Sequence, residues 1–84
     1  MKTKLKESVI LEDVENEYIL VDLESAQYLA LNKTAMMMTL AIRDTGDTSA
    51  AIDKVLEYTE ADRDTLERDM DKFVNELKEL ELVE

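Results

Sequence analysis

One stretch decides the fold: Ala26-Gln27-Tyr28-Leu29-Ala30-Leu31-Asn32. It is typical of a β-strand that runs directly into a helix, because Asn is a favoured N-cap residue, with Thr34 as the competing cap. Strand side chains alternate between two faces, which places Leu29 and Leu31 together with Gln27. Since Leu31 adjoins the helix start, we expect the Leu29 and Leu31 face to point inward. The pattern leaves the direction of Tyr28 open.

Two further strands are predicted before this stretch. Residues 8–14 are rich in β-branched side chains, residues 18–23 form the strongest β pattern, and a turn lies between them at residues 15–17. Three strands joined by short turns form an antiparallel meander, whose first and third strands are edges. We expect residues 1–7, which hold three lysines, to be frayed.

The second half of the chain has helical patterns. A first helix is predicted from Lys33 to about residue 44; it is apolar nearly all round, so it should be central and covered on several sides. We interpret its methionines, residues 36–38, as gap-filling core residues rather than a partner surface. Gly46, the only glycine, is placed to end this helix. A short second helix should begin at residue 47 or 48 and reach about Tyr58.

A third helix is predicted from a capping-box variant at residues 59–62 to about Leu80. Its apolar residues fall at helical spacing on one stripe: Leu66, Met70, Phe73, Val74 and Leu77. The final Leu82 and Val83 are expected to fold back on the sheet. Strands followed by helices predict one α+β domain over residues 1–84, winged-helix-like, with a three-stranded antiparallel sheet followed by a three-helix bundle.

Composition excludes several functions. The 84 residues contain no Cys and no His, which removes disulfides, the commonest general base and the commonest metal ligand. No nucleophile–base pair and no EF-hand spacing is apparent, so we expect no enzyme activity, metal or cofactor. The net charge of −11, from 21 acids and 10 bases, opposes binding to nucleic acid and to anionic membranes. No apolar run approaches membrane-spanning length, and we expect a cytoplasmic protein.

Three runs of residues carry a resemblance to a known family. Residues Tyr28 to Ala35 match an aromatic-x-x-Leu-Asn-x-Thr-Gly/Ala pattern, and residues 66–77 match an Asp followed by an apolar residue, then Phe-Leu and Leu. With the ending at residues 80–83, they resemble the PqqD-like proteins, the small peptide-recognition domains of ribosomally made peptide biosynthesis (RiPP recognition elements). Ala26 and Glu81 stand where that family often has glycine.

The resemblance implies a binding function. In the family, the leader of a precursor peptide adds as an extra strand to the third strand, in a groove beside the third helix. The protein then presents the precursor to a maturation enzyme, which is a leader peptidase in lasso-peptide pathways or a radical enzyme elsewhere. The peptide-binding residues expected here are Gln27, Tyr28, Leu29, Ala30 and Leu31 from the strand, and Thr65, Asp69, Lys72, Phe73 and Glu76 from the helix.

Physical roles can be given to the helix residues at this site. Phe73 would form the apolar floor, Asp69 could meet a leader cation, and Lys72 could meet a leader carboxylate. Plainer interpretations stay open, because Phe73 suits a core and the charged residues suit a solvated helix face. Two other functions also stay open: a winged-helix regulator, which the acidic third helix disfavours as a DNA binder, and a homodimer that pairs its own sheet edges.

Overall fold

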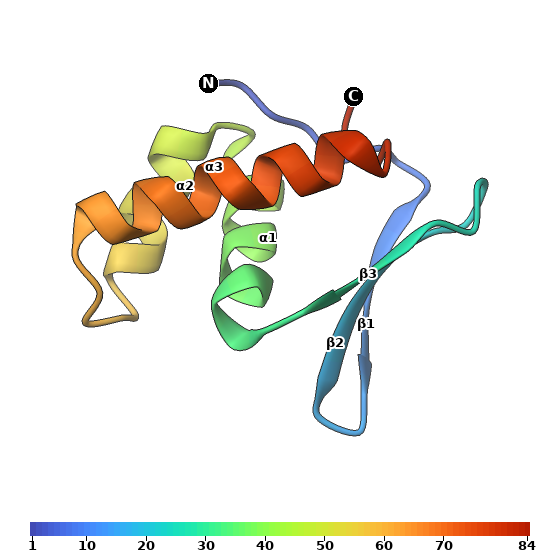
Figure 1. Cartoon of the computed structure of the whole chain (residues 1–84), viewed down its shortest axis with the longest axis horizontal. Helices are drawn as coiled ribbons and strands as arrows, with labels where there is room; N and C mark the ends of the chain where they lie inside the picture. The colour runs from blue at the N-terminus through green and yellow to red at the C-terminus, as the bar shows by residue number, and fades with distance from the viewer.

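The computed structural model describes residues 1–84 and contains three strands followed by three helices. The strands are β1 (Val9–Val14), β2 (Glu17–Asp22) and β3 (Tyr28–Leu31), and the helices are α1 (Lys33–Thr45), α2 (Thr48–Leu56) and α3 (Arg63–Glu79). The helices gather on one side of the molecule and the sheet lies on the other (Figure 1). This arrangement confirms the α+β fold that the element order predicts. The antiparallel sheet has the order β1-β2-β3, so β1 and β3 are both edges.

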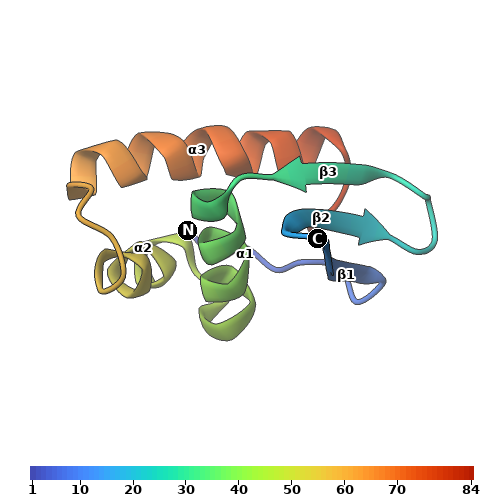
Figure 2. The ribbon, with the colours of Figure 1, turned by 90° about the horizontal axis from the view of Figure 1, so that it is seen from below.

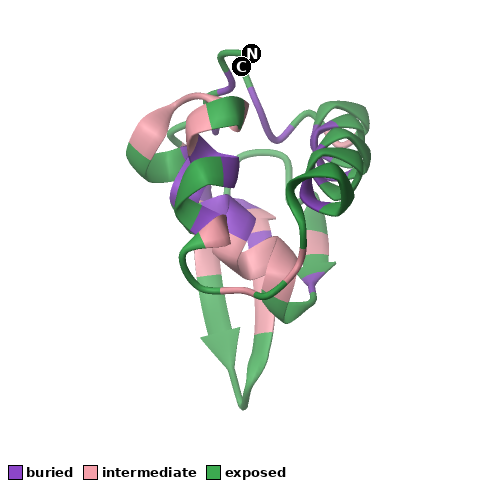
Figure 3. Ribbon diagram, turned by 90° about the vertical axis from the view of Figure 1, so that its left-hand side faces the viewer, coloured by how far each residue is buried: buried purple, intermediate pink, exposed green.

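A two-residue turn joins β1 to β2. Glu15 and Asn16 have positive φ values of 51° and 70°, as the two central residues of a type I′ hairpin turn require. Val14 pairs with Glu17 directly behind the turn. The tip of this hairpin extends away from the helices and is exposed (Figure 3).

The connection from β2 to β3 is organised by a buried carboxylate. Asp22, which is 2% exposed, accepts hydrogen bonds from the Glu24 N–H at 3.0 Å and from the Ser25 hydroxyl at 2.9 Å. The Ser8 hydroxyl, the Glu24 N–H and the Ser25 hydroxyl together hold the pKa of Asp22 below its usual range. The ionised side chain therefore fixes the turn from which β3 starts.

The strand itself is shorter than the stretch that predicts it. Ala26 has φ 63°, and its N–H donates to the Asp22 carbonyl at 2.8 Å, so it belongs to the turn. Regular pairing begins at Tyr28. The expectation that the strand starts at residue 26 is wrong because a left-handed residue cannot continue a β-ladder.

The first helix has the predicted ends. The Asn32 side chain accepts the Ala35 N–H at 2.7 Å, and Gly46 ends the helix with φ 67°. It is less enclosed than predicted, because Leu40 is 42% exposed. Of the three consecutive methionines, Met38 is buried in the core, whereas the other two are half-buried.

The start of α3 differs from the prediction. Asp62, not Thr59, is the N-cap, and its carboxylate accepts the Thr65 N–H at 2.8 Å. Thr59 instead accepts the Ala61 N–H at 3.3 Å within the connecting loop. Asp and Thr are both favoured N-cap residues, and Asp62 is the cap because the helix begins at Arg63. The second helix ends at Leu56, before the expected limit.

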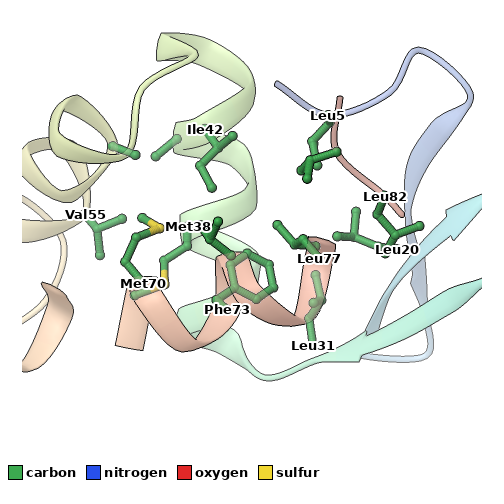
Figure 4. Packing of buried hydrophobic residues seen from close by; sticks show 14 of the residues in the cluster. Leu5, Leu20, Leu31, Met38, Ile42, Val55, Met70, Phe73, Leu77 and Leu82 are labelled. Carbon is green, nitrogen blue, oxygen red and sulfur yellow. The ribbon is translucent and has the colours of Figure 1, made fainter. Parts of the chain in front are cut away.

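One apolar cluster joins the helices to the sheet. The predicted stripe of α3 is buried throughout. Figure 4 shows Phe73 and Met70 of this stripe in the same cluster as Met38 of α1 and Leu20 of β2. Leu82, from the end of the chain, completes the part of the cluster nearest the sheet.

The N-terminal residues are held, not frayed. Thr3 and Leu5 are buried, and the Thr3 N–H donates to the Gly46 carbonyl at 3.0 Å. The Lys6 N–H donates to the Leu82 carbonyl at 3.1 Å, so the end of the chain returns against residues 4–6 rather than against a strand. Every second side chain of this segment, at Thr3 and Leu5, is buried, and this packing holds the segment in place. None of the helices has the length and apolar character that a membrane crossing requires.

Candidate peptide-binding groove

A groove of about 290 Å³ lies between β3 and α3. Figure 2 shows the strand running beside the C-terminal half of the helix. Three elements line the groove: β3 and the residue after it, the first turns of α1, and one face of α3. The lining residues are Leu29, Ala30, Leu31, Asn32, Thr34, Ala35, Met38, Asp69, Lys72, Phe73 and Glu76.

The outer edge of β3 presents the peptide groups of Tyr28 and Ala30. Along an antiparallel ladder, alternate residues direct both N–H and C=O to the same neighbour. The Asp22 N–H donates to the Gln27 carbonyl at 2.8 Å, which fixes the start of this alternation. Leu29 therefore bonds to β2, while Tyr28 and Ala30 point their backbone groups away from the sheet. No other strand covers them, because β3 ends the strand order.

The side chains of β3 divide between the two faces as predicted. Leu31 is buried and Leu29 is half-buried, so their shared face points inward. Tyr28 is 67% exposed, which answers the question that the sequence leaves open. Ala30 is also exposed and has too small a side chain to shield the backbone beside it.

The wall formed by α3 combines an apolar floor with free charges. Phe73 is 6% exposed, so it is both a core residue and part of the groove lining. Asp69, Lys72 and Glu76 are spaced by three and four residues and share one helix face. All three are exposed, and none forms an ion pair within the molecule. Their charges are therefore free to meet a ligand.

Sequence reasoning missed the part of the groove formed by α1. Asn32, Thr34, Ala35 and Met38 close one end of it. The Asn32 side chain is engaged with the Ala35 N–H, so this end has a fixed shape. The N-cap Asn32 was the available sequence signal. Because only this residue separates β3 from α1, the first turn of the helix must lie beside the end of the strand.

Three predicted site residues lie outside the groove lining. Gln27 is in the turn, and Tyr28 is at the outer start of β3. Thr65 lies in the first turn of α3, where its N–H is bonded to Asp62. The remaining predicted residues are brought together: Leu29, Ala30, Leu31, Asp69, Lys72, Phe73 and Glu76.

The groove is suited to binding an extended chain. An unpaired strand edge offers hydrogen bonds of little sequence preference, and pockets beside it select side chains. The apolar floor can accept one face of such a strand, and the α3 charges can select its polar residues. No group of three or more carboxylates is placed to hold a metal ion.

One protein family matches this sequence, and two solved structures share its fold. Residues 17–83 match the family described as coenzyme PQQ synthesis protein D (PqqD). Two solved structures are similar, each with a TM-score of 0.81 and 23% sequence identity. TbiB1 in complex with the TbiA(beta) leader peptide matches over 96% of this chain and 94% of that chain. Lasso peptide synthetase B1 complexed with the leader peptide matches over 100% and 99%, respectively. No curated protein matches the sequence.

Proposed function

The chain belongs to the PqqD family, and from this premise we propose that it is a non-catalytic protein that binds the leader segment of a ribosomally made precursor peptide. The observation that carries the proposal is the open edge of β3 beside a groove that has an apolar floor and unpaired charges. The two similar solved structures are complexes with leader peptides, which supports the same kind of ligand here.

The leader binds as a fourth strand. Its backbone bonds to the outward N–H and C=O groups of Tyr28 and Ala30, and alternate side chains enter the groove over Phe73. Lys72 meets a leader carboxylate, and Asp69 and Glu76 meet leader cations or N–H groups. Because the leader loses conformational entropy on binding, we expect a binding free energy of about −8 to −10 kcal/mol, which is micromolar to sub-micromolar affinity.

The bound precursor is then presented to a maturation enzyme, such as a leader peptidase or a radical enzyme. The binding protein contributes position and effective concentration, and the partner contributes the chemistry. We place this encounter in the cytoplasm, because a ribosomally made precursor is released there.

The decisive experiment first searches the reading frames beside this gene for a short precursor peptide and then uses the leader of that peptide. Titrated into ¹⁵N-labelled protein, it should shift the amide signals of residues 28–31 and 69–76. Ala30→Pro removes an N–H that points away from β2, so the sheet should persist while the leader loses one backbone hydrogen bond and meets the proline ring. We expect affinity to fall at least about tenfold.

Ala30→Ser is the matched control, because it keeps the N–H and adds only a hydroxyl. It should bind the leader within about twofold of the unchanged protein. Amide shifts confined to α1, or equal leader affinity in Ala30→Pro and Ala30→Ser, would contradict the proposed strand addition.

A further inference from the structure

The sheet has a second open edge, at β1, with a larger groove beside it. This groove has a volume of about 660 Å³ and lies on the side of the sheet away from β3. It is formed by residues 4–7, by residues 9–11 of β1 and by residues 42–46 at the end of α1. Ile10 and Leu11 are half-buried there and supply an apolar surface.

The backbone of β1 has free hydrogen-bonding groups at this edge. The Leu23 N–H donates to the Ser8 carbonyl at 2.9 Å, so residues that alternate with Ser8 bond to β2. Val9, Leu11 and Asp13 therefore direct their peptide groups outward. The Val9 N–H is already bonded, to the carbonyl of the residue three before it, at 3.0 Å. Leu11 and Asp13 keep both N–H and C=O available.

Three basic residues line this groove in a chain whose net charge is −11. Lys4 pairs with Glu84 at 3.5 Å, whereas Lys6 and Arg43 form no ion pair within the molecule. In so acidic a protein, two unpaired cations beside an open strand make a local site for carboxylates.

The acids nearby do not cancel this site. Asp44 pairs with Lys54 at 3.3 Å, outside the strand edge, which leaves Glu7 as the one unpaired acid of the lining. Further along β1, Glu12 and Asp13 are exposed and negative. The edge is thus basic at its start and acidic toward the hairpin tip, a gradient that orients any charged strand laid along it.

We propose that this groove is a second docking site, for an extended acidic segment of a partner protein. The segment adds to β1 through Leu11 and Asp13, with its carboxylates over Lys6 and Arg43 and its uncharged part toward the hairpin tip. A partner whose acidity is confined to this segment is favoured over a second copy, because two whole chains of charge −11 repel each other more strongly than one such chain repels a segment with two carboxylates.

This site goes beyond the proposed leader binding and is independent of it. The two open edges are separated by β2, so a chain at β1 leaves β3 accessible. A protein with two such edges can hold a precursor and a second protein at the same time, which is what presentation to another protein requires.

The test uses two capped synthetic peptides of about eight residues, long enough to span β1. Both peptides have an alternating valine–threonine sequence in which two residues of one half are replaced by charged residues. These two residues are glutamates in the first peptide and lysines in the second. The glutamate peptide should shift the amide signals of residues 4–13 and slow amide exchange at Leu11 and Asp13. The lysine peptide has no carboxylates for Lys6 and Arg43, so any shifts that it causes should stay near Glu12 and Asp13 and leave residues 4–6 unchanged.

Two double variants with the same change in net charge separate the site from general electrostatics. Lys6→Glu with Arg43→Glu should weaken the glutamate peptide about tenfold, whereas Arg68→Glu with Lys78→Glu, on α3, should leave it within about twofold. Ala30→Pro should leave this binding unchanged, so failure here and failure of leader binding are distinguishable.

Three results would overturn the proposal. The first is the absence of β1 shifts with millimolar glutamate peptide. The second is equal binding of the lysine peptide, which would show that the cations do not select the ligand. The third is a dimer in sedimentation experiments without peptide, with Leu11 and Asp13 already protected from exchange, which would make a second copy the occupant.

Discussion

Replacing Glu81 by glycine should stabilise the protein, because the end of α3 requires a left-handed residue. Leu80 is the C-cap, and Glu81 follows with φ 57°. The Leu82 N–H donates to the Leu77 carbonyl at 2.8 Å, and the Glu81 N–H donates to the Lys78 carbonyl at 3.0 Å. These two bonds form a Schellman motif, whose left-handed position is usually glycine.

The expected size follows from three terms. The left-handed conformation costs a residue with a Cβ atom about 1 kcal/mol or somewhat more. Glycine lowers the free energy of unfolding by about 0.5 kcal/mol, because it increases the conformational entropy of the unfolded chain. Removing a carboxylate from the negative end of α3 gains about 0.5 kcal/mol. Glu81→Gly should therefore raise the free energy of unfolding by about 1 kcal/mol, or Tm by roughly 4–8 °C for a chain of this size.

Thermal and urea unfolding followed by circular dichroism measure this change, with Glu81→Ala as the matched control. Alanine removes the charge but keeps the Cβ atom, so it should gain only the helix-dipole contribution, about 0.5 kcal/mol. If Glu81→Gly is no more stable than Glu81→Ala, the left-handed strain assigned to Glu81 is refuted.

Three other changes test the same physical account. Ala26→Gly should add about 0.5–1 kcal/mol in the same unfolding experiments, since φ at this turn is 63°. Leu82→Ala should cost about 3 kcal/mol, because Leu82 is fully buried, and amide exchange in residues 4–6 should accelerate. Hydrogen bonds lower the folded-state pKa of Asp22, Asp47 and Asp62. The main donor is a hydroxyl group for Asp22 and a backbone N–H group for each of the other two. Their contribution is present above the unfolded pKa of about 4 and is lost as pH falls through the folded values, so the urea midpoint should decrease below about pH 4.

Sequence patterns predict what depends on neighbours along the chain. The period of two around Leu29 and Leu31 gives both the strand and its inward face, and the period of 3.6 gives the buried stripe of α3. Once Phe73 is placed inward, Asp69 and Glu76 must lie on the adjoining flank. Most of the groove wall on α3 follows from that geometry.

What the sequence does not predict depends on packing between distant segments. The order of Thr3 comes from its bond to Gly46, which no local pattern of residues 1–7 reveals. The choice of Asp62 over Thr59 as a cap depends on where α3 meets the core. Likewise, the groove at β1 exists because the end of α1 lies beside that strand, and its one visible sequence signal is an excess of lysine before residue 7.

Both open edges have a consequence for solubility that can be tested by lowering the pH. At neutral pH we expect the charge of −11 to keep molecules apart, so that unpaired strands do not add to one another. The isoelectric point is about 4.3. Hydrogen bonds hold the pKa of Asp22, Asp47 and Asp62 below the usual range, so we expect the stabilisation that these aspartates provide to persist near this pH. Near this pH, folded molecules should associate through their edges, and light scattering should rise before circular dichroism changes. Ala30→Pro blocks one edge and should reduce the scattering relative to Ala30→Ser, as should an excess of leader. Scattering that appears only after the circular dichroism signal is lost would assign the association to unfolded chains instead, and would remove net charge as the reason that the edges stay open.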